Sequence, residues 1–72
     1  MPRYLVTTRR AVRSSAMSAR DAVSAEPGVT LVASNDPQMV TIEASEDTAG
    51  RLQAKLKDTH IVEREIRRGL VE

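Results

Sequence analysis

The sequence contains no cysteine, no tryptophan and no phenylalanine, and Tyr4 is its only aromatic residue. The absence of cysteine excludes disulfides, thiolate metal sites and cysteine nucleophiles. The chain has 72 residues, which leaves room for one core, and a core of this size rarely supplies more than about 3 to 5 kcal/mol of stability. We therefore expect a single domain over residues 1–72 that depends on aliphatic packing alone or gains stability from a partner.

The chain also lacks a strong charge of either sign. Eleven Lys and Arg residues nearly balance ten Asp and Glu residues, so no overall field attracts nucleic acid or an anionic membrane. The balance hides an asymmetry, because residues 1–20 carry five arginines and no acid. An Arg-rich and Ser-rich start is also typical of an organellar transit peptide, but this segment contains a strand and a helix that the domain needs.

Long apolar runs are missing as well. No run reaches half of the about 18 residues of a membrane span, and no apolar segment typical of a secretory signal follows Met1. We therefore expect a cytoplasmic protein that has neither a membrane nor a nucleic acid as its partner.

The N-terminal half of the chain predicts a strand followed by a helix. Residues 4–8 are aromatic and β-branched, which is typical of a strand. Within residues 11–25, apolar side chains recur at spacings of four, three and four, which places them on one stripe of a helix. The residues of this stripe are Val12, Ala16, Ala19 and Val23. Pro27 and Gly28 end the predicted helix.

The rest of the chain predicts a hairpin, a second helix and a last strand. Residues 29–33 and 39–44 flank a Ser-Asn-Asp-Pro turn signal, which favours a β-hairpin. Ser45 is a typical N-cap, and apolar residues then recur at helical spacing up to Leu56. Residues 60–67 combine apolar and charged side chains as a strand with one face in water does.

The resulting order is strand, helix, strand, strand, helix, strand, which predicts an α+β fold. It is the ferredoxin-like βαββαβ sandwich, in which a four-stranded antiparallel sheet carries two helices on one face. The fold alone does not give the function, because the same arrangement hosts enzymes, metal carriers, ligand sensors and RNA binders.

The residue types offer little for catalysis or for metal binding. His60 is the only histidine, and no motif gives it a Ser or Asp partner. One imidazole among scattered carboxylates is a poor metal site, so we expect His60 at the surface or at a strand edge. Glu63 and Glu65 share one face of the last strand, but an exposed strand lacks the pocket that acid catalysis requires. We therefore expect no enzymatic activity, no cofactor and no bound metal.

Several short motifs resemble those of subtilisin propeptides. They are Tyr4-Leu5-Val6, Glu26-Pro27-Gly28 after the first helix, the central hairpin, residues 52–58, and the ending Asp58-Thr59-His60-Ile61-Val62-Glu63-Arg64-Glu65. Their order and spacing extend the resemblance over essentially the whole chain. The resemblance implies a ferredoxin-like domain that inhibits a subtilisin-type serine protease or assists its folding. The start at Met1 and the stop at Glu72 favour a free-standing inhibitor or chaperone over a piece of a zymogen.

The resemblance also implies which residues contact the protease. The open face of the sheet would pack on two protease helices, Glu63 matches the Glu of the family's Val-Glu motif, and Glu65 would cap a helix N-terminus. The C-terminal segment would lie in the active-site cleft like a substrate. This segment consists of Arg67, Arg68, Gly69, Leu70, Val71 and Glu72. Two departures stand out: Arg64 replaces a usual acid, and the charge of Glu72 suits an apolar primary subsite poorly.

Other interpretations remain open. The domain is alternatively a ferredoxin-like oligomerisation or small-ligand-binding module, whose uncovered sheet face forms a weak homodimer through an apolar patch. That patch would consist of Val32, Met39 and Thr41. A nucleic-acid contact through the arginines of residues 9–13 would show a steep dependence on salt. A single aromatic residue, however, cannot stack successive bases, and these arginines fit a solvated strand end and helix start.

Overall fold

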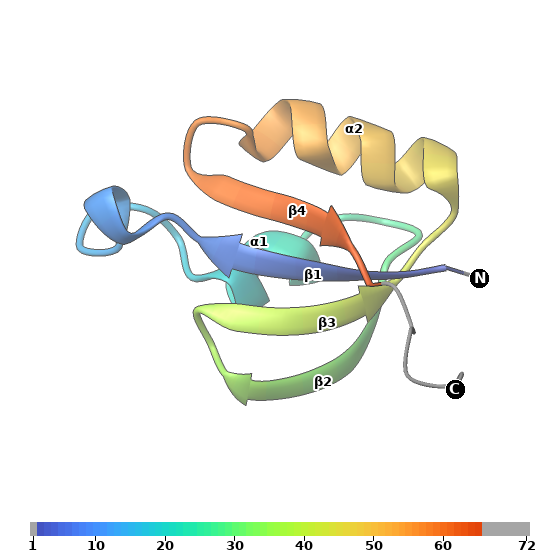
Figure 1. Cartoon of the computed structure of the whole chain (residues 1–72), viewed down its shortest axis with the longest axis horizontal. Helices are drawn as coiled ribbons and strands as arrows, with labels where there is room; N and C mark the ends of the chain where they lie inside the picture. The colour runs from blue at the N-terminus through green and yellow to red at the C-terminus, as the bar shows by residue number, and fades with distance from the viewer. Residues whose placement is uncertain (1, 66–72) are drawn as a thin grey trace, which may run out of the picture.

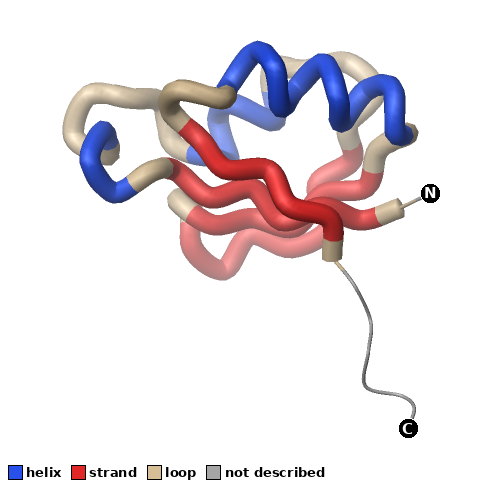
Figure 2. The backbone as a smooth tube through the Cα atoms, turned by 45° about the horizontal axis from the view of Figure 1, so that its top comes forward, coloured by secondary structure: helices blue, strands red, loops and turns tan. Residues whose placement is uncertain are grey.

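Strands and helices follow one another in the order that the sequence predicts. The structure is a computed structural model that describes residues 2–65. Its elements are β1 (Arg3–Thr8), the 3-10 turn η1 (Arg10–Val12), α1 (Ala19–Ser24), β2 (Thr30–Asp36), β3 (Met39–Glu43), α2 (Glu46–Leu56) and β4 (His60–Arg64). The strands form one four-stranded antiparallel sheet in the order β2-β3-β1-β4, and both helices cover the same face of it (Figures 1 and 2). The predicted ferredoxin-like α+β fold is therefore confirmed.

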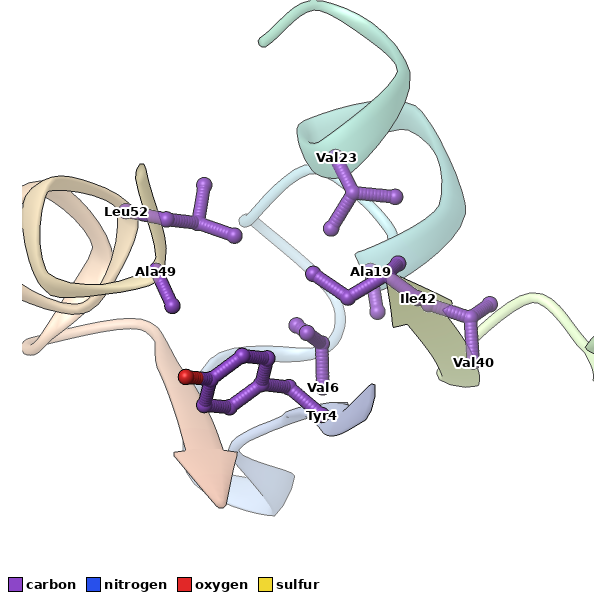
Figure 3. Packing of buried hydrophobic residues seen from close by; sticks show 8 residues of the cluster. All are labelled: Tyr4, Val6, Ala19, Val23, Val40, Ile42, Ala49 and Leu52. Carbon is purple, nitrogen blue, oxygen red and sulfur yellow. The ribbon is translucent and has the colours of Figure 1, made fainter. Parts of the chain in front are cut away.

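The core lies between the sheet and the two helices. Alternate side chains of β1 and β3 point toward the helices, and α1 and α2 each turn an apolar stripe toward the sheet (Figure 3). The buried cluster consists of Tyr4, Val6, Ala19, Val23, Val40, Ile42, Ala49 and Leu52. Because Tyr4 is its only aromatic member, the core depends on small and medium aliphatic side chains, as the composition indicates.

The predicted helix over residues 11–25 is wrong in its first half, because α1 begins only at Ala19. Residues 10–12 form η1 instead, and Val12 and Ala16 are only half-buried. This part of the chain extends past the end of the sheet (Figure 1), where an apolar stripe has no core to pack against. Ser18 then starts α1, because its Oγ accepts a hydrogen bond of 3.2 Å from a backbone N–H of the first turn.

The central hairpin is present, but its turn lies later than predicted. β2 continues to Asp36, so the turn consists of Pro37 and Gln38 rather than of residues 34–37. The Asp36 carboxylate accepts a 2.9 Å hydrogen bond from the backbone N–H of Gln38, which is a typical Asx turn. The pairing of β2 with β3 also has two register shifts, so this edge strand is irregular.

Helix α2 begins as predicted. Ser45 Oγ accepts a hydrogen bond from the backbone N–H of Thr48 at 3.2 Å. Ala49 and Leu52 are buried and Leu56 is partly buried against the same cluster, so the predicted stripe faces the core. Within residues 2–65, no helix is long and apolar enough to cross a membrane.

Candidate functional site

The sheet face opposite the helices has no described element packed on it, and we call it the open face (Figure 2). Strand register places its side chains in three rows across β3, β1 and β4. The backbone N–H of Glu65 donates to the carbonyl of Arg3 at 2.9 Å, which continues this register one residue past β4. The rows are Met39, Thr7 and Ile61; Thr41, Leu5 and Glu63; and Glu43, Arg3 and Glu65.

One end of the open face is apolar. Met39 is 47% exposed and Ile61 is 38% exposed, and they lie on opposite sides of Thr7 in the same row. Leu5 is half-buried in the next row. Isolated exposed apolar residues are common, but several on the same end of one sheet face give an area that a partner can bury.

The other end of the open face is charged. Glu63 and Glu65 are both exposed. In the last row, Arg3 lies between Glu43 and Glu65, and its Nε is 3.3 Å from Glu43 Oε2. Both partners of this ion pair are partly exposed, so solvent screens it and it adds little to stability. Glu63 and Glu65, by contrast, form no ion pair with any side chain of residues 2–65.

Arg64 lies between Glu63 and Glu65 in the chain but does not belong to the open face. It pairs in register with the buried Tyr4, so its side chain points to the helix side of the sheet. There its Nη1 lies 3.3 Å from Glu46 Oε2 at the start of α2. The basic side chain of Arg64 therefore does not lie between Glu63 and Glu65 on the open face.

The structure locates two of the predicted contact residues, and their role in binding a protease stays a prediction. It places Glu63 and Glu65 together on the open face, as a strand with a two-residue period requires. The predicted cleft-binding residues Arg67, Arg68, Gly69, Leu70, Val71 and Glu72 lie outside the described residues. Of the apolar patch proposed for a homodimer, Met39 and Thr41 lie on the open face, and Val32 lies in the irregular part of β2.

Of the two positions predicted for His60, the surface position is wrong, because only 3% of the residue is exposed. His60 is instead the first residue of the edge strand β4. Its Nε2 lies 2.9 Å from the carbonyl oxygen of Met17, and its Nδ1 lies 2.7 Å from Thr59 Oγ1. A carbonyl oxygen only accepts, so Nε2 donates this hydrogen bond. The alternation of β4, with His60 and Val62 on one side, is the sequence signal that indicates its inward position. No group of side chains within residues 2–65 could hold a metal ion together with it.

No protein-family model matches the chain, and no curated protein and no solved structure shows significant similarity to it. What is established is a small α+β domain with a four-stranded antiparallel sheet in the ferredoxin-like order.

Proposed function

We propose that this domain binds a protein through its open face and that the partner is a subtilisin-type serine protease, which the domain inhibits or helps to fold. The observation that carries the proposal is the pair of exposed carboxylates, Glu63 and Glu65, at the charged end of a sheet face on which nothing described is packed. The ferredoxin-like fold is also the one that the resemblance to subtilisin propeptides implies.

In this proposal, the apolar end and the charged end of the open face contribute differently to binding. Met39, Ile61 and Leu5 supply apolar area, which provides the main favourable term in protein association. Glu63 and Glu65 face the N-termini of two protease helices, where unpaired backbone N–H groups and the helix dipole favour negative charge. The acids thus orient the partner, and the apolar row holds it.

The segment after Glu65 completes the proposed complex. Glu65, the last described residue before it, lies at the charged end of the open face. In the proposal, residues 67–72 lie along the edge of the active-site cleft as an added strand. A segment held in this way blocks substrate and is itself exposed to cleavage, so an inhibitor and a slow substrate differ only in how long the segment stays bound.

The decisive experiment is a titration of the intact protein against a panel of subtilisin-type proteases, together with the recovery of protease activity after dilution from denaturant. We expect stoichiometric inhibition or faster recovery with at least one protease. Replacing both acids (Glu63→Gln with Glu65→Gln) should weaken the effect at least about tenfold. Removal of residues 69–72 should abolish inhibition and leave binding measurable.

Asp58→Asn provides the matched control, because Asp58 is exposed in the turn after α2 and not on the open face. It removes the same kind of charge, so it should change neither inhibition nor recovery. If no protease responds, or if Asp58→Asn is as damaging as the double replacement, the proposed function is wrong.

The exposed row of Met39 and Ile61 also favours a second candidate, in which the open face pairs with that of another copy. Sedimentation at several concentrations separates the two. A dimer that dissociates when Ile61 is replaced by Ser, in a protein that affects no protease, would favour an oligomerisation module.

A further inference from the structure

Residues 9–17 form a projecting segment between β1 and α1, which we call the basic arm (Figure 1). None of its residues is buried, so it adds nothing to the core. It carries three arginines, Arg9, Arg10 and Arg13, and no acid. Ordering a segment of this length costs conformational entropy, and a segment with no buried residue gains little packing energy to offset that cost.

The basic arm is nevertheless held at both ends by hydrogen bonds, at its start to the connection between α2 and β4 and at its end to the first residue of β4. At its start, the Arg9 guanidinium donates two hydrogen bonds to the carbonyl of Lys57, from Nε at 3.1 Å and from Nη2 at 2.9 Å, and the Arg9 backbone N–H donates to Thr59 at 2.8 Å. At its end, the buried imidazole of His60 donates to the carbonyl of Met17 at 2.9 Å. These bonds hold the exposed segment in place in advance of any contact.

The charge around the basic arm limits what it can bind. Arg10 and Arg13 are exposed on it. An exposed acid lies nearby, because Asp58 directly follows Lys57, whose carbonyl accepts the hydrogen bonds of the Arg9 guanidinium. A long polyanion such as nucleic acid would meet this acid as well as the arginines, whereas a short anionic segment would contact the arm alone.

The arm also presents one large apolar side chain, because Met17 is 57% exposed at its end. We propose that the basic arm is a second interaction surface, which binds a short acidic segment of a protein that also carries an apolar residue. Carboxylates of that segment pair with Arg10 and Arg13, and its apolar side chain packs on Met17. This inference is independent of the proposed function, because no residue of the arm belongs to the open face.

The test uses the intact protein and a short labelled peptide of glutamates with one central leucine, followed by fluorescence anisotropy at low salt. We expect saturable binding that weakens at least about tenfold when Arg10→Gln is combined with Arg13→Gln. Arg10→Gln alone should weaken it in part; it is the cleaner variant, because Arg13 Nε also donates to the Thr8 carbonyl at 3.3 Å. Replacing the central leucine of the peptide by serine should weaken binding further.

Arg51→Gln is the matched control, since Arg51 is an exposed arginine of α2 outside the arm. It should leave the peptide affinity unchanged. Three results would overturn the inference: no saturable binding of the peptide, an equal loss with Arg51→Gln, or tighter binding of a labelled mixed-sequence DNA with a steep salt dependence.

Discussion

Two isoleucines on opposite faces of the sheet offer a direct test of how the domain is built. Ile42 in β3 is fully buried under the helices, whereas Ile61 in β4 is 38% exposed on the open face. Truncation of each to alanine removes the same atoms, from the interior strand β3 in one case and from the edge strand β4 in the other. Any difference in the free energy of unfolding therefore reports the environment of the two side chains and not the chemistry of the change.

The expected difference is large for a domain of this size. Ile42→Ala leaves a cavity in the core and should cost about 2 to 5 kcal/mol. Ile61→Ala leaves no closed cavity and removes a side chain that still contacts water, so it should cost about 1 kcal/mol or less. Because a core of this size supplies only about 3 to 5 kcal/mol in total, Ile42→Ala should unfold much of the protein at room temperature. Ile42→Val, at about 1 kcal/mol, keeps the comparison measurable in a folded chain.

The free energy of unfolding of Ile42→Ala, Ile42→Val and Ile61→Ala is measured by urea unfolding, which is followed by circular dichroism at several protein concentrations. The reasoning would be refuted if Ile61→Ala destabilised the isolated protein as much as Ile42→Ala does. Such a result means that the open face is covered in solution. A midpoint that rises with protein concentration would then identify a second copy as the cover, since mass action links assembly to stability.

The remaining predictions concern two glycines and one histidine. Gly28 has φ of 85°, and an added Cβ would lie 3.3 Å from Thr48 Oγ1, so Gly28→Ala should cost about 1 to 2 kcal/mol. Gly50 lies inside α2 with nothing within 4 Å of an added Cβ, so Gly50→Ala should instead stabilise by about 1 kcal/mol, and thermal unfolding of the pair must show shifts of opposite sign. His60→Ala should cost about 1 to 3 kcal/mol and expose the basic arm to trypsin, because it leaves the Met17 carbonyl without its donor; unchanged cleavage at the arm would show that His60 does not anchor it.

The sequence predicts the fold well because local signals and burial agree in most of the chain. The alternation of β3 and the Ser45 cap followed by a stripe of apolar residues in α2 each correspond to one element with one buried face. The secondary structure of such segments depends mainly on residues that are close together in the sequence. Only their order was then needed to predict the ferredoxin-like arrangement.

Prediction fails where the outcome depends on contacts between distant segments. The stripe from Val12 to Val23 has helical spacing along its whole length, but only its second half lies over the sheet, so only that half becomes helix. The position of His60 depends on a carbonyl of Met17, which is 43 residues away in the chain. Neither spacing nor composition could show that this carbonyl would lie within reach.

β4 contributes to both proposed surfaces, the open face and the basic arm, because its alternate side chains point to opposite sides of the sheet. His60 and Val62 point toward the helices, and Ile61 and Glu63 point to the open face. A slip of one residue in the pairing with β1 would expose His60, release the basic arm and bury Glu63 in an apolar core, where an unpaired carboxylate is costly. The hydrogen bonds of the buried imidazole therefore fix more than the arm. They help to fix the register that places Glu63 on the open face. In the proposed complex, Glu63 would then already be oriented before the partner binds, which lowers the entropic cost of binding.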